Sequence, residues 1–156
     1  MTKIYKCLSQ NTFMLLENEI IFRYLVSVII GLFIGFSRKH KPAGVRTFAL
    51  ISLGCTIFTV ISINNFPGSD PTRIIAQVVS GIGFLGLGVI WKNELNKPYG
   101  LTTAAAIWAT ASVGILIGMG MWLEVVAGSA LILVILYAKK PIEKLELPKL
   151  KKINVK

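Results

Sequence analysis

Three polar residues, Asp70, Arg73 and Gln77, stand at the start of an apolar stretch, where ionisable and amide side chains are uncommon. Arg73 and Gln77 are four positions apart, so in a helix they share one face just beyond Asp70. Such side chains at the border of an apolar segment indicate a partner group or a water-filled cavity. They predict a polar site for an ion or for a partner's side chain. The alternative is structural, with an Asp70–Arg73 pair that fixes the start of the helix.

A second polar group comes from two other segments. Arg46 ends a basic stretch that also contains Arg38, Lys39 and Lys41, and Thr102 and Thr103 open a later apolar block. We expect these residues to meet if both segments lie at the same end of the fold. The alternatives are a purely topological role for the cations, and capping or back-bonding to the helix for the two threonines.

Glycines recur at helical spacings. Gly81, Gly83 and Gly86 match the dinucleotide-binding pattern G-x-G-x-x-G, but that pattern works only as a turn between a strand and a helix. Here the glycines lie inside an apolar block, so we interpret them as sites of close helix packing. An unwound segment is the remaining alternative, since glycine weakens a helix by roughly 1 kcal/mol against alanine. The packing interpretation extends to two further pairs: Gly31 with Gly35, and Gly114 with Gly118.

The sequence offers no set of residues typical of an enzyme active site or a metal centre. The single histidine, His40, stands among cations, and the two cysteines, Cys7 and Cys55, are far apart. Catalysis needs a nucleophile, a base and an oxyanion donor, or a metal, in one pocket. We therefore expect no enzymatic activity, no metal and no cofactor. The central parts of the apolar blocks also lack Asp and Glu, which argues against a cation pathway through one subunit.

The elements that must position these residues are predicted to be membrane-spanning helices. Hydrophobic residues make up 54% of the chain and charged residues only 15%, against about 25% charged in a typical soluble domain. The apolar residues form blocks at about 20–36, 47–63, 72–90, 101–117 and 121–138. Each block approaches or exceeds the roughly 17 residues of a minimal spanning helix. We expect an all-α integral membrane protein, a bundle of about five transmembrane helices in a lipid bilayer.

The basic residues predict the orientation and the division of the chain. Of 17 Lys and Arg residues, thirteen lie in the segments 37–46 and 91–100 and in the tail. By the positive-inside rule these segments face the cytoplasm and the N-terminus lies outside. Basic loops against anionic lipid account for the net charge of +10 without a nucleic-acid partner. The predicted parts are an extracytoplasmic N-terminal segment (1–18), a transmembrane domain (19–138) and a basic cytoplasmic tail (139–156).

Four motifs resemble those of the MgtC/SapB family, in the same order and spacing. They are GLFIG at 31–35, KPAGVRT at 41–47, DPTRIIAQVVSGIGFLG at 70–86 and GLTTAAAIW at 100–108. The resemblance covers roughly residues 20 to 135. Two positions depart from the family pattern: Ser37, where an acidic residue is common, and Leu87, where alanine is usual. We also expect this chain to lack the soluble, ACT-like C-terminal domain of the virulence-linked members.

The resemblance implies a bacterial inner-membrane protein linked to survival in low magnesium and, in pathogens, to life inside macrophages. Members of the family act largely by binding other membrane proteins, including the ATP synthase. The leading hypothesis is therefore a non-enzymatic regulator that docks against partner membrane proteins. The alternatives are a transporter or channel for a small cation or metabolite, and a homo-oligomeric scaffold without its own ligand. Carried over by position, the resemblance points to six functional residues: Arg46, Asp70, Arg73, Gln77, Thr102 and Thr103.

Overall fold

The computed structural model describes residues 2–39, 41, 43–64, 70, 72–92 and 98–138, and side chains within 18–90 and 99–138 of these ranges. The predicted tail at 139–156 lies outside them. The described chain forms α1 (Thr2–Phe36), α2 (Val45–Asn64), α3 (Thr72–Gly88), α4 (Leu101–Met119) and α5 (Trp122–Tyr137). Two short strands, β1 (Trp91–Lys92) and β2 (Pro98–Tyr99), pair antiparallel between α3 and α4. The prediction of an all-α bundle with five helices is confirmed.

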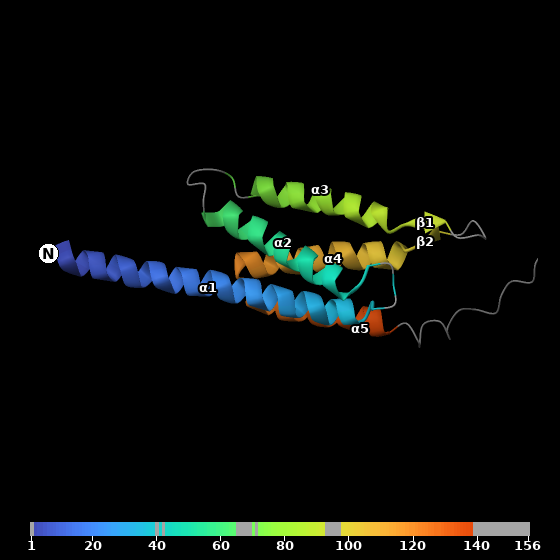
Figure 1. Ribbon diagram of the computed structural model, residues 1–156, viewed down its shortest axis with the longest axis horizontal. Helices are drawn as coiled ribbons and strands as arrows, with labels where there is room; N and C mark the ends of the chain where they lie inside the picture. The colour runs from blue at the N-terminus through green and yellow to red at the C-terminus, as the bar shows by residue number, and fades with distance from the viewer. Residues whose placement is uncertain are drawn as a thin grey trace, which may run out of the picture.

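The helices lie side by side, and successive helices run in opposite directions (Figure 1). The turn after α1 and the β1–β2 ladder consequently lie at the same end of the bundle. We call it the basic end because it holds four cations: Arg38, Lys39, Lys41 and Arg46. The opposite end is called the acidic end because it holds every carboxylate whose side chain the structure describes: Glu19, Asp70 and Glu124.

The centre of the bundle is formed by α2 and α4, and α1 packs against α2. α2 buries nine residues and α4 buries ten, whereas α3 and α5 bury two each. Phe48 on α2 and Ile107 and Ile117 on α4 are almost completely enclosed. On α3 only Ile82 and Gly86 are buried. α3 is therefore a peripheral helix with a broad face that no part of the described chain covers.

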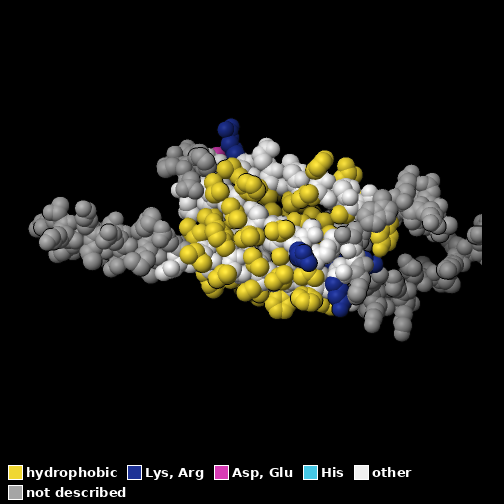
Figure 2. Space-filling model, viewed as in Figure 1, with side chains coloured by type: hydrophobic (Ala, Val, Ile, Leu, Met, Phe, Trp, Pro, Cys, Tyr) yellow, Lys and Arg dark blue, Asp and Glu magenta, His cyan; other side chains and the backbone are white. Residues whose placement is uncertain are grey.

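The outer surface suits a lipid environment. Large apolar side chains such as Phe33, Phe84 and Leu123 are exposed, and hydrophobic side chains cover the middle of the bundle while Lys and Arg lie towards its ends (Figure 2). Three helical segments are long and apolar enough to cross a membrane by themselves: Asn18–Phe36, Val45–Asn64 and Leu101–Met119. α3 and α5 are apolar and shorter, with 17 and 16 residues, or about 25 Å each. The fold is an all-α membrane bundle.

The helix ends follow the chemistry of single residues. α3 begins at Thr72, whose backbone N–H donates to the Asp70 side chain, as expected for an N-cap. α4 ends at Gly120, which adopts φ +76° and donates its N–H to the Ile117 carbonyl. α1 begins at Thr2, well before the expected start near Ile20. The reason is local, since neither glycine nor proline occurs before Gly31.

Candidate functional site

An apolar groove runs between α2 and α3 and has a volume of about 570 Å³. The α2 wall consists of Thr47, Leu50, Ile51, Gly54, Cys55 and Phe58. The α3 wall consists of Ile74, Gln77, Val78, Gly81, Ile82 and Leu85. Two of the lining residues, Gly54 and Gly81, place no side chain in the groove. No atom lies within 4 Å of the point where a Cβ would stand on Gly54 or Gly81.

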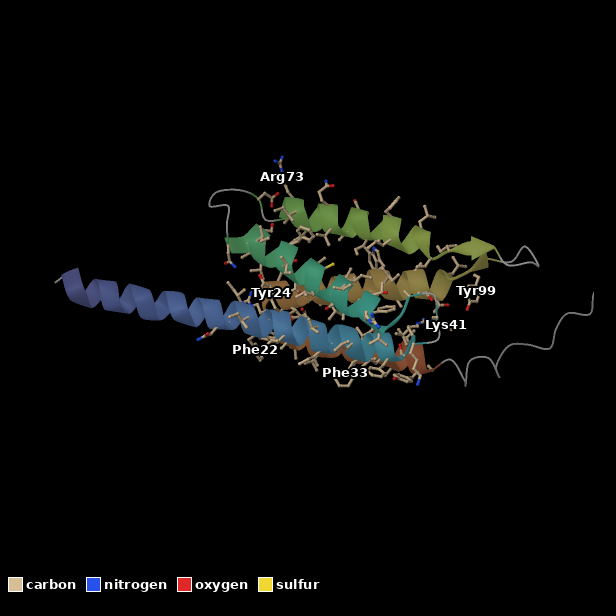
Figure 3. The ribbon with its side chains drawn as sticks, viewed as in Figure 1. Phe22, Tyr24, Phe33, Lys41, Arg73 and Tyr99 are labelled. Atoms are coloured by element: carbon tan, nitrogen blue, oxygen red, sulfur yellow. The ribbon has the colours of Figure 1, made fainter. Side chains whose placement is uncertain are left out.

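Gln77 places an amide in this apolar groove. The side chain is exposed, and no hydrogen bond joins it to any side chain or backbone group that the structure describes. Arg73, one turn earlier, does not line the groove and points away from the bundle (Figure 3). Four positions apart in the continuous helix α3, Arg73 and Gln77 share one side of it. Only Gln77 lines the groove, and Arg73 lies nearer the acidic end.

The Asp70 carboxylate caps the start of α3 and does not pair with the Arg73 side chain. Its Oδ1 accepts a hydrogen bond from the Thr72 backbone N–H at 2.9 Å and another from the Thr72 hydroxyl at 2.7 Å. The hydroxyl bond first, and then the backbone bond, hold the pKa of Asp70 below its usual value. Arg73 meets Asp70 only through a backbone N–H···O bond of 3.3 Å. Within the described side chains, the one ion pair joins Arg23 to Glu19 instead.

At the basic end the segments of the second predicted group do meet, but through Arg38. Its Nη2 donates to the backbone carbonyl of Thr102 at 3.1 Å, and the residue is only 7% exposed. Burial lowers the pKa of Arg38, and its Nε is buried without a hydrogen-bond partner. Thr102 is exposed and Thr103 is buried. Arg46 is exposed on the first turn of α2, and no hydrogen bond or ion pair joins it to the described part of the chain.

Four of the seven glycines singled out from the sequence lie at tight interfaces with α2. A Cβ on Gly31 would stand 2.7 Å from the Ala49 Cα, and one on Gly35 the same distance from the Val45 Cα. On α4, a Cβ on Gly114 would stand 2.5 Å from the Ser52 carbonyl oxygen. A Cβ on Gly118 would stand equally close to the Thr59 Cβ. These glycines allow α1 and α4 to approach α2 at backbone distance.

The three glycines of α3 are placed differently. Gly86 lies in ordinary contact with α4, since a Cβ there would stand 3.6 Å from the Ala104 Cβ. Gly81 and Gly83 face open space, with no described atom within 4 Å of an added Cβ. Within this chain, therefore, Gly81 and Gly83 do not serve the close packing that their spacing predicts. Gly81 lines the groove, whereas Gly83 lies on another side of the helix and does not line it.

Two structural links were not predicted from the sequence. The Thr56 hydroxyl donates to the Gly114 carbonyl at 2.9 Å and so joins α2 to α4. The Arg23 guanidinium donates to the Gly118 carbonyl at 2.6 Å and pairs with Glu19 at 2.5 Å. A cation is favourable there because the carbonyl end of α4 carries partial negative charge. The available signal was the spacing of Glu19 and Arg23 by four residues.

Comparison with known proteins gives a consistent result. The sequence model of the MgtC family matches residues 24–145. An uncharacterised protein of Synechocystis is 42% identical over 80% of this chain and 54% of its own length. Protein MgtC of Salmonella typhimurium is 42% identical over 75% of this chain and 52% of its own length. Protein MgtC of Brucella abortus is 47% identical over 60% of this chain and 40% of its own length.

The chain thus spans about half the length of the curated relatives that it matches. No solved structure matches it.

Proposed function

This chain belongs to the MgtC family, and on that basis we propose that it is a non-enzymatic regulator that binds a transmembrane helix of another membrane protein. The binding site is the groove between α2 and α3. The resemblance to the family supports the bacterial inner membrane as its location, and magnesium limitation, stress or virulence as its context. Transporters and the ATP synthase are the partner classes that the resemblance implies. The distribution of Lys and Arg supports an outside N-terminus and a basic cytoplasmic end.

The single observation that carries this proposal is the pair of uncovered glycines, Gly54 on α2 and Gly81 on α3, in the two walls of the groove. Apolar surface alone gives helices little reason to associate in lipid, because lipid tails are equally apolar. Association there depends on close backbone approach at small residues and on hydrogen bonds between helices. Gly54 and Gly81 supply the small residues, and a Cβ added at either position would have no described neighbour within 4 Å.

Gln77 supplies the polar contact. Its amide carries two donors and one acceptor oxygen, lines the groove and lacks a partner among the described groups. An amide left unpaired against hydrocarbon is unfavourable by several kcal/mol. A partner helix with a polar side chain at the same depth would satisfy it. The groove wall on α3 extends from Ile74 to Leu85, a rise of about 16 Å or three helical turns, which is enough to seat one helix.

A photocrosslinking experiment tests the proposal. A photoreactive amino acid replaces Leu85, which is exposed in the groove, in bacterial cells starved of magnesium. The expected product is an adduct that maps to a transmembrane helix of a different membrane protein. The control is the same amino acid at Leu131, exposed on α5, which should give no such adduct. Adducts only with a second copy of this chain, or only with lipid, contradict the proposal.

A pair of matched variants sharpens the test. Gly81→Leu places a side chain in the groove at a point where the new Cβ has no described neighbour within 4 Å. Gly128→Leu is the control, since Gly128 on α5 is equally open. Both changes should leave the fold intact. We expect Gly81→Leu to abolish the adduct from Leu85 and the growth advantage in low magnesium, and Gly128→Leu to preserve both.

The alternative of a transporter or channel receives less support from the site. Asp70 is engaged by Thr72, and Arg73 points away from the groove. Among the described residues no three His, Cys, Asp or Glu side chains gather into a group that could hold a metal ion. Purified protein in liposomes should therefore carry no cation or metabolite flux. A gradient-driven flux that Arg73→Ala or Gln77→Ala abolishes would favour the transporter over the regulator.

A further inference from the structure

The first turn of α4 at the basic end is a helix start without a side-chain cap. Gly100 precedes the helix at φ +93°, and no side chain caps the N-terminus. The first N–H that returns to the Gly100 carbonyl is that of Ala104, at 2.9 Å. The N–H groups of Leu101, Thr102 and Thr103 therefore have no acceptor within the helix. Together with the helix dipole, such groups make a start that favours an anion.

A buried cation is aimed at the same turn. Arg38 is only 7% exposed, and its Nη2 reaches the Thr102 carbonyl at 3.1 Å. That single carbonyl is a poor match for five N–H donors and a full positive charge, and the Nε is buried without a partner. No carboxylate of the described part of the chain lies at this end. A buried cation without a counter-ion is strongly unfavourable unless something compensates it.

A second cation lies beside the turn. The Lys41 ammonium stands 5.8 Å from the ring centre of Tyr99, the residue directly before Gly100. Lys41 and Tyr99 lie together at the basic end (Figure 3). The open amides, the buried guanidinium and the lysine thus combine three sources of positive potential at one helix start. The described surroundings provide nothing negative to balance them.

We propose that this turn, with Arg38 and Lys41, binds a phosphate group. A phosphate presents several strong acceptor oxygens and one or two negative charges, which suits both a guanidinium and the N–H groups of a helix start. The group belongs either to the headgroup of an anionic phospholipid or to a free phosphate in the surrounding water. Both sources share the same chemistry, and the experiment distinguishes them. The site is separate from the α2–α3 groove, so it stands or falls independently of the proposed function.

The experiment uses the full chain purified in a neutral maltoside detergent, which contains no phosphate. In one arm, the melting temperature is followed as inorganic phosphate is added, with sodium chloride at matched ionic strength as the reference. In the other arm, phosphatidylglycerol is added to the micelles, and bound lipid is counted by native mass spectrometry. A ligand that binds only the folded state raises the melting temperature in a saturable way. We expect saturation with at least one of the two probes.

Variants assign the effect to the site. Arg38→Gln should weaken binding by about tenfold or more, as expected for losing one charge-assisted contact. Lys41→Gln should weaken it by a smaller factor. The matched control is Lys39→Gln, which removes an exposed cation next to Arg38 in the turn after α1 and should leave binding unchanged. If Arg38→Gln does not fold, Arg38→Lys decides instead, because it keeps the charge but loses the planar fork and should bind measurably more weakly.

Each outcome has one meaning. Saturation by phosphatidylglycerol alone assigns the site to a lipid headgroup, and saturation by inorganic phosphate as well assigns it to phosphate groups in general. Stabilisation that matches the chloride reference in both arms overturns the proposal. So does equal weakening by Arg38→Gln and Lys39→Gln, because that result would show only a general attraction of anions to a basic surface.

Discussion

A single methyl group added at Gly114 should weaken the packing of α4 against α2. A Cβ there would stand 2.5 Å from the Ser52 carbonyl oxygen and 2.9 Å from the Cys55 Cβ. The nearest obstacle is backbone, which cannot rotate away as a side chain can. Gly114→Ala must therefore push α4 away from α2, the two helices that form the centre of the bundle. The same movement stretches the hydrogen bond from the Thr56 hydroxyl to the Gly114 carbonyl.

The magnitude follows from three contributions. Overpacking of a tight interface costs about 1–3 kcal/mol. A weakened hydrogen bond between helices in a membrane protein adds about 0.6 kcal/mol. Against these, replacing glycine by alanine inside a helix stabilises the folded state by up to about 1 kcal/mol. We expect Gly114→Ala to lower the free energy of unfolding by about 0.6–2.6 kcal/mol.

The assay is reversible unfolding in mixed micelles, in which the fraction of denaturing detergent is raised and tryptophan fluorescence reports the folded fraction. Gly128→Ala is the matched control, because it makes the same change where nothing lies within 4 Å. It should be neutral or stabilising by up to about 1 kcal/mol. If Gly114→Ala proves as stable as Gly128→Ala, the close approach of α2 and α4 is not what holds the bundle together, and the reasoning is refuted.

Two further predictions concern the acidic end. Arg23→Gln removes the cation that donates to the Gly118 carbonyl and should destabilise the fold by roughly 1–2 kcal/mol. The control Arg73→Gln, at an exposed position, should change stability by less than about 0.5 kcal/mol. The same unfolding assay compares the two variants, and equal effects contradict the capping role of Arg23. For Asp70, the folded-state pKa is lowered by its bonds from Thr72, so its stabilising contribution is present above the unfolded pKa of about 3.9 and is lost as pH falls through the lower folded value. Melting temperatures measured on descending pH should therefore fall less steeply below about pH 4 in Asp70→Asn than in the unsubstituted chain, and identical pH profiles would show that the carboxylate has no such role.

The sequence by itself determined the number of helices, the start of most of them and the membrane character, but not the short strands β1 and β2. Four of the five expected starts lie within two residues of the observed ones, because apolar blocks of spanning length are separated by residues with strong local preferences. Asp70 and Gly120 act through contacts with residues no more than four positions away, so their effects are visible without a fold. The exception is α1, where the chain lacks any helix breaker before Gly31 and remains helical up to Thr2.

The sequence determined the candidate glycines but not their partners. Six glycines carry the same signal, a small residue within a regularly spaced set in an apolar helix. They are Gly31, Gly35, Gly114, Gly118, Gly81 and Gly83. The first four pack against α2, and the last two face open space. Spacing along one helix records which residues share a face, but not which other helix, if any, lies opposite. That choice depends on how α1, α3 and α5, with their similar apolar surfaces, arrange around α2 and α4.

Only the tertiary structure decided which polar groups meet. Arg38 and Thr102 are 64 positions apart, and Arg23 and Gly118 are 95 positions apart. In both contacts the acceptor is a backbone carbonyl, which every residue possesses and which therefore leaves no mark in the sequence. Local chemistry sets where each helix begins and ends, whereas long-range packing sets which helix end faces a given arginine. For that reason the contact of the buried Arg38 with the start of α4 could be identified only from the tertiary structure.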